Sequence, residues 1–204
     1  MRRAIKPAIA LAFLALFGWG TWRVYDFYTL PFNPTRLADS EMRMWRDYYS
    51  GNRMGLGLEL VKAVREQFKV GQNDAMEIAR DFAGAAVAFQ SASGNYESVA
   101  LPELEAGYER VRKVVGGTWD SGQAARAELE WWVQRRTPGH ESTAEVGRSI
   151  ATLYALLYGR TNARLERAGY LRAEAARVRD QSGDWPRVQK LLRESYSELA
   201  YGVR

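Results

Sequence analysis

The chain has 204 residues, of which 47% are hydrophobic and 26% charged, a composition typical of a folded protein rather than a disordered one. It contains no cysteine, which excludes disulfides, thiolate metal sites, cysteine nucleophiles and a lipid anchor on cysteine. The formal net charge is +5, and four basic residues near the N-terminus carry most of it: Arg2, Arg3, Lys6 and Arg23. Removing these four charges from +5 leaves +1. The rest of the chain therefore lacks the excess positive charge that a nucleic-acid partner requires.

Residues 7–22 form a continuous run of apolar and neutral residues directly after three basic ones. A membrane-spanning helix needs about 20 residues at about 1.5 Å per residue, and Ala4 and Ile5 extend the run toward that length. An aromatic belt follows at the far end, where the membrane interface is expected: Trp19, Trp22, Tyr25 and Tyr28. We therefore predict that residues 1–28 are a single transmembrane anchor in contact with membrane lipid.

The flanking charges predict the orientation of this anchor. Three basic residues precede the run and one follows it, so the positive-inside rule places the N-terminus in the cytoplasm. The remainder would then be periplasmic or extracellular, held on a bacterial inner (cytoplasmic) membrane. A cleaved signal peptide has the same basic and apolar regions but requires small residues at its cleavage site. Gly18 and Gly20 could serve there, whereas Trp19 and Trp22 crowd the site and favour a retained anchor.

Residues 29–39 contain Pro31 and Pro34 and are predicted to be an extended linker, because a residue before proline avoids the helical region. After the linker every pattern is helical. We expect helices over 40–50, over 58–69 and from 73 or 74 to 92. A fourth helix is expected to begin at Pro102, which suits a first helical turn, and to end near residue 116.

The second half of the chain carries clear helix boundaries. A fifth helix is expected to begin at a cap near Asp120 and to end before residue 138. Ser142 and Glu145 form a capping box that begins a sixth, which either ends at Gly159 or continues to about residue 181. Asp184 is expected to cap the last helix.

These patterns predict an all-α fold, because no alternating run of β-branched residues indicates a sheet. An N-terminal single transmembrane helix would precede a soluble bundle of about six to eight helices. The bundle would be an extracytoplasmic all-helical domain covering residues 40–204, joined to the anchor by the linker 29–39.

Two predicted helices place charged side chains within aromatic surfaces. At about 100° per residue, Glu128 and Arg135 fall on the apolar side of a helix that also carries Trp132. Glu41 lies on a similar surface of the first helix, formed by Met42, Met44, Trp45, Tyr48 and Tyr49. Glu128 and Arg135 lie about 10.5 Å apart along the axis, too far to pair directly. Each is expected to find its partner on another helix, because an unpaired buried charge is costly.

Glu41, Glu128, Trp132 and Arg135 therefore support two interpretations. They either line a pocket, catalytic or suited to an anionic or aromatic ligand, or form an interior polar network that fixes how the helices pack. The sequence leaves both interpretations open.

Catalytic and cofactor motifs are missing from the sequence. The chain has one histidine, His140, in a predicted loop where a surface or capping role is expected. No Walker A or dinucleotide-binding glycine motif occurs, and the Glu-x-x-His motif of di-iron bundles is absent. We identify no catalytic residue, no metal ligand and no cofactor, and we expect a non-enzymatic role more than an enzymatic one.

The leading expectation is a single-pass, membrane-anchored interaction protein, an accessory or assembly subunit of a larger respiratory, photosynthetic or envelope complex. One alternative is a helical enzyme or ligand-binding domain built on the pocket. Another is a peripheral lipid-binding domain, which would use a run of arginines between residues 160 and 179. That run contains Arg160, Arg164, Arg167, Arg172, Arg177 and Arg179.

Overall fold

The computed structural model describes residues 30–204. The predicted anchor 1–28, with its aromatic belt, lies outside the described residues. Within residues 30–204, no helix is both long enough and apolar enough to cross a membrane. The chain divides into two units, Met1–Pro31 and Phe32–Arg204, and all the helices described below belong to the second.

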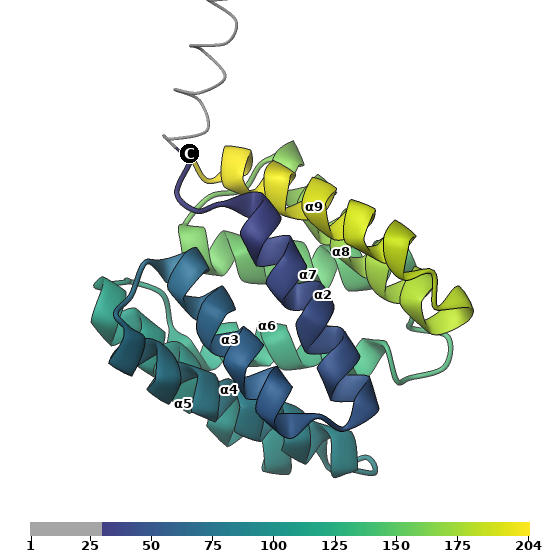
Figure 1. The fold of residues 1–204 in the computed structure, drawn as a ribbon, viewed down its shortest axis with the longest axis horizontal. Coiled ribbons are helices and arrows are strands. Elements are labelled where there is room, and N and C mark those ends of the chain that lie inside the picture. Colours follow the sequence, from purple (N-terminus) through teal and green to yellow (C-terminus); the bar gives the residue numbers. More distant parts are fainter. Residues whose placement is uncertain (1–29) are drawn as a thin grey trace, which may run out of the picture. The chain divides into compact units, whose positions relative to one another are not determined.

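The second unit is all-α, as the sequence predicts, and the described residues form eight helices (Figure 1). These are α2 (Pro34–Ser50), α3 (Arg53–Phe68), α4 (Gln72–Ser91), α5 (Tyr96–Val115), α6 (Ser121–Gln134), α7 (Thr143–Tyr158), α8 (Ala163–Ser182) and α9 (Trp185–Gly202).

The eight helices form a closed ring. Each packs against the helix before it and the helix after it, and α9 packs back against α2. Figure 1 shows α2 and α9 side by side, although they lie at opposite ends of the described chain. Because the ring closes, every helix has a side that faces the centre, and the inward side chains of all eight meet there.

Capping side chains fix where several helices begin. Asp120, Ser142 and Asp184 each accept a hydrogen bond from the backbone N–H three residues later. These three starts confirm the expectations from the sequence. Helix α7 ends at Gly159, whose φ of 63° lies in the left-handed region that glycine adopts without steric cost. The sixth predicted helix therefore stops there rather than continuing to residue 181.

Three predicted helix starts are wrong. Helix α3 begins at Arg53 instead of residue 58. Helix α2 begins at Pro34, so residues 34–39 of the expected linker are helical. Asn33 caps this helix with its side chain, and proline fits the first turn because no N–H is needed there. Helix α5 begins at Tyr96, which places Pro102 inside the helix instead of at its start.

Helices α7 and α8 approach each other with their backbones in contact. A Cβ atom added to Gly169 would lie 2.3 Å from the carbonyl oxygen of Gly147. One added to Gly147 would lie 2.9 Å from the Cα of Tyr170. The two glycines therefore allow a spacing that alanine would prevent, and this close contact fixes α8, and with it Arg172, against the ring.

Candidate ligand-binding cavity

A cavity of about 480 Å³, partly open to solvent, lies at the centre of the ring. All eight described helices contribute side chains to its wall. Its volume is within the range of roughly 300–1,000 Å³ typical of small-molecule sites. Sites between the helices of a bundle are a common place for ligands, because facing helices can aim side chains at one point.

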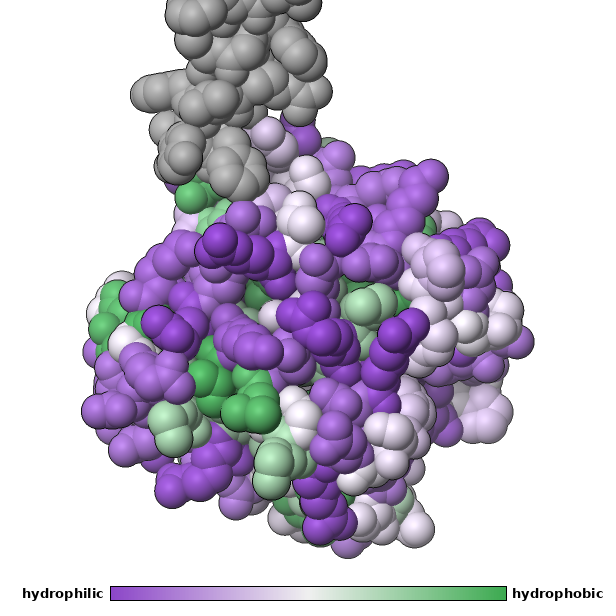
Figure 2. Space-filling model, in the orientation of Figure 1, coloured by the Kyte–Doolittle hydropathy of each residue, from purple (hydrophilic) through white to green (hydrophobic). Residues whose placement is uncertain are grey.

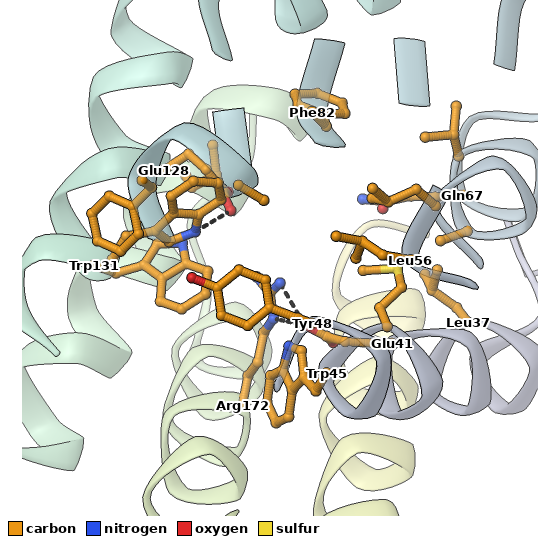
Figure 3. Close-up of a pocket in the computed structure, with 18 of the residues that line it drawn as sticks. Leu37, Glu41, Trp45, Tyr48, Leu56, Gln67, Phe82, Glu128, Trp131 and Arg172 are labelled. Carbon is orange, nitrogen blue, oxygen red and sulfur yellow. Dashed lines mark hydrogen bonds and ion pairs between the residues drawn. The ribbon is translucent and has the colours of Figure 1, made fainter. Parts of the chain in front are cut away.

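One wall of the cavity is apolar. Helices α2 and α3 contribute Leu37, Leu56 and Val64, and α4 contributes Phe82. In Figure 3, Leu37 and Leu56 lie across the open space from Glu128 and Trp131. The cavity thus places an apolar surface opposite a polar one.

Glu41 and Arg172 form a buried ion pair on the polar side (Figure 3). The Nη2 and Nε atoms of Arg172 lie 2.6 and 2.7 Å from Oε1 of Glu41. Burial acts to lower the pKa of Arg172, but Glu41 and the other surrounding acidic groups together outweigh it and leave that pKa well above its ordinary value. The pair is therefore charged, and it joins α2 to α8.

Glu128 is held by neutral donors. The Tyr108 hydroxyl donates to Oε2 and the Trp132 indole N–H donates to Oε1, each at 2.9 Å. Burial raises the pKa of Tyr108 well above its ordinary value, and the negative charge of Glu128 raises it further. Tyr108 therefore keeps its proton and remains a donor. It lies on α5, so Glu128 does find a partner on another helix.

Arg135 pairs with Asp180 on α8, again a partner on another helix. Arg179 shares the same carboxylate, with its Nη2 and Nε atoms 2.8 and 2.9 Å from Oδ1. The side chains of Arg135 and Arg179 are only 13% and 8% exposed. Burial lowers the pKa of both, and repulsion from Arg135 contributes to lowering that of Arg179 to about 10. Two buried cations thus share one carboxylate.

Aromatic rings hold the arginines in place. The guanidinium carbon of Arg179 lies 4.5 Å from the ring centroid of Trp45 and 4.6 Å from that of Tyr49. The guanidinium of Arg136 lies 4.1 Å from the Phe89 ring and donates a hydrogen bond to the Phe89 carbonyl. Such cation–π contacts position a guanidinium without neutralising its charge.

Several buried polar atoms of residues that line the cavity lack hydrogen-bond partners among the described residues. They include Nε1 of Trp131 in the last turn of α6, Nη1 of Arg135, which caps the end of that helix, and Oε2 of Glu41 on α2. A buried polar group without a partner costs on the order of 1–3 kcal/mol. These atoms therefore favour a molecule that brings complementary groups into the cavity.

The four residues singled out from the sequence all line this cavity: Glu41, Glu128, Trp132 and Arg135. Glu128 and Trp132 are hydrogen-bonded to each other, while Glu128 and Arg135 have separate partners. Sequence reasoning missed Arg172 and Arg179 as cavity residues, because it considered them only as part of the arginine run between residues 160 and 179. Both line the cavity, so the arginines of residues 160–179 do not form one exposed surface.

His140 is exposed, in the connection between α6 and α7. No protein-family model, curated protein or solved structure matches the chain. What the domain does must therefore be inferred from the cavity itself.

Proposed function

We propose that the helical ring is a ligand-binding domain that takes a small amphipathic molecule into its central cavity. The observation that supports this is the pairing of two surfaces around one space of about 480 Å³. The apolar body of such a molecule would contact side chains such as Leu56 and Phe82, while its polar group would meet the unpartnered N–H groups of Trp131 and Arg135.

Binding fits the chemistry of the cavity better than catalysis does. Glu41 is paired with Arg172, and both oxygens of Glu128 accept hydrogen bonds from neutral donors. A general base needs a carboxylate that can take a proton from a substrate. Glu128 is engaged at both oxygens and Glu41 is held in an ion pair through one of them, so we assign both glutamates the role of holding the wall in place.

A neutral fluorescent probe, N-phenyl-1-naphthylamine, tests this proposal with the full-length chain in mild detergent. Saturable binding to the wild type and its loss in Ala86→Trp, which fills the cavity, are expected. Ala106→Trp, an exposed position on α5, is the matched control and should bind like the wild type. Equal binding by the wild type and Ala86→Trp, or no saturable binding at all, would contradict the proposal.

A second candidate function is a membrane-anchored interaction protein, an accessory or assembly subunit of a larger inner-membrane complex. It is supported by exposed apolar side chains on the outside of the ring, where Met54 and Leu58 of α3 are 79% and 58% exposed. Figure 2 shows hydrophobic side chains gathered over α3. Exposed apolar clusters often mark protein interaction sites.

Purification of the full-length chain in mild detergent tests this second candidate. We expect a defined partner to co-purify with the wild type and to be lost from Leu58→Lys. Lys62→Ala, an exposed position one turn further along α3, should retain it. Recovery of the chain by itself would count against this candidate and leave the ligand-binding proposal unaffected.

A further inference from the structure

We infer that the molecule bound in the cavity carries one negatively charged group, such as a carboxylate, sulfonate or phosphate, held by Arg135 and Arg179. This inference rests on the proposed function, which requires only that a small amphipathic molecule binds. It adds the charge of the ligand and the end of the cavity where that charge lies.

The first argument is the balance of charge at this end of the cavity. Arg135 and Arg179 share Asp180, whose side chain is 42% exposed and therefore partly solvated. Arg136, which also lines the cavity, donates hydrogen bonds to two neutral oxygens among the described residues, the Phe89 carbonyl and the Tyr48 hydroxyl. Two largely buried guanidinium groups, those of Arg135 and Arg179, thus share one carboxylate, and the exposed Arg136 adds a third cation beside them. An anion in the cavity would compensate the excess, because buried like charges without a counter-charge are unfavourable.

The second argument is geometric. Nη1 of Arg135 is buried and has no hydrogen-bond partner among the described residues, and the same holds for Nε1 of Trp131. Trp131 is 8% exposed and lies four residues before Arg135, the C-terminal cap of α6, whose backbone is still helical, so the two side chains lie on the same side of the helix. Two unpartnered N–H donors on one side of a helix suit an acceptor with more than one oxygen, as in a carboxylate or sulfonate.

The rest of the polar wall does not offer the same site. Arg172 is already matched by Glu41, and Glu128 is itself negative and hydrogen-bonded at both oxygens. An anion would therefore avoid that region. The charged group is assigned to the end formed by Arg135 and Arg179, and the apolar body to the opposite wall around Leu56.

A matched pair of probes tests the inference on the full-length chain. The anionic probe 8-anilinonaphthalene-1-sulfonate has the same aromatic body as N-phenyl-1-naphthylamine and adds a sulfonate. Because a hydrogen bond to a charged group is the stronger kind, we expect the wild type to bind the anionic probe at least about tenfold more tightly than the neutral one. Detergent background is subtracted with Ala86→Trp measured under the same conditions.

Two variants with opposite expected effects locate the charge. Arg135→Gln should abolish the preference for the anionic probe, weakening its binding far more than that of the neutral probe. Asp180→Asn removes the competing carboxylate and should strengthen anionic binding. Arg193→Gln removes an exposed cation that pairs with Asp39, and it should leave both affinities unchanged.

The outcomes separate the inference from the proposed function. Equal affinity of the wild type for both probes, or a preference that survives Arg135→Gln in a variant with native circular dichroism, overturns the inference and leaves the binding domain intact. Weaker anionic binding by Asp180→Asn also overturns it. If neither probe binds the cavity, the proposed function fails as well.

Discussion

Two clusters on the wall of the same cavity combine arginine and carboxylate in opposite ways. Glu41 and Arg172 form a matched pair, and their side chains are 1% and 13% exposed. Arg135 and Arg179 share Asp180, so cations outnumber carboxylates there. The pKa of Arg172 lies well above its ordinary value because Glu41 and the other surrounding acidic groups together outweigh burial. The pKa of Arg179 falls to about 10 because burial and the neighbouring Arg135 both act against its charge.

The difference separates a structural role from a binding role. In the matched pair the two opposite charges balance each other within the protein, so the pair can hold α2 against α8 without a charged ligand. In the unmatched cluster, the protein leaves positive charge and a free N–H on Arg135. Removing one charged side chain should therefore lower the free energy of unfolding strongly in the matched pair and change it little in the unmatched cluster.

The largest expected effect is that of Glu41→Gln. This substitution leaves Arg172 charged and buried without its counter-charge, which should reduce the free energy of unfolding by about 3–5 kcal/mol. Urea denaturation followed by circular dichroism measures it. The double variant Glu41→Leu with Arg172→Met should be clearly more stable than Glu41→Gln, since it removes both charges. If the single variant is as stable as the wild type, the matched pair is not structural.

The second effect is a loss of folding stability at alkaline pH, which arises from Tyr154 beside the matched pair. Burial raises the pKa of Tyr154 to about 12, so the folded state holds this proton more tightly than the unfolded state does. The resulting stability is fully present below pH 10 and is lost as pH rises through 12. A shift of about two units corresponds to about 3 kcal/mol.

Tyr154→Phe isolates this contribution, because phenylalanine has no proton to lose. The stability of the wild type relative to Tyr154→Phe should fall between pH 10 and 12. Urea denaturation of both proteins across this range measures the change. A constant difference would show that Tyr154 ionises as readily in the folded state as in the unfolded state.

A smaller effect is expected where Glu128 depends on neutral donors. Trp132→Phe removes the indole N–H that donates to Oε1 of Glu128 and leaves the Tyr108 hydrogen bond in place. The expected loss is about 1–2 kcal/mol in the free energy of unfolding, because Glu128 is buried but keeps one partner. Thermal denaturation compared with Tyr170→Phe, at an exposed position, provides the measurement and its control.

The sequence predicts the buried acids better than the arginines that accompany them. Glu41 and Glu128 could be found because each interrupts an aromatic surface at helical spacing. Arg172 and Arg179 lie among other arginines on α8, where the simplest interpretation is an exposed basic surface. Only the closure of the ring by α9 against α2 shows which side of α8 faces inward. That contact joins segments far apart in the chain and has no local signal in the sequence.

Helix boundaries show the same limit. The starts at Asp120, Ser142 and Asp184 were predictable because the capping side chain is adjacent to the helix it caps. The start at Pro34 was missed because proline indicates either a linker or a first helical turn. In the structure Pro34 lies in the first turn of α2, and α2 packs against both α3 and α9.

Arg135→Gln should have the smallest effect on stability. It tests most directly whether the matched pair and the unmatched cluster differ in role. The substitution removes one of two cations that share Asp180 and leaves Arg179 with a carboxylate of its own. Relief of repulsion should offset the lost ion pair, so the free energy of unfolding should change by less than about 1 kcal/mol. The pKa of Arg179 should rise toward its ordinary value, because repulsion from Arg135 is one cause of its shift. If Arg135→Gln destabilises the protein as much as Glu41→Gln does, both clusters are structural. A near-neutral change means instead that the positive charge of Arg135 is retained for a purpose other than folding.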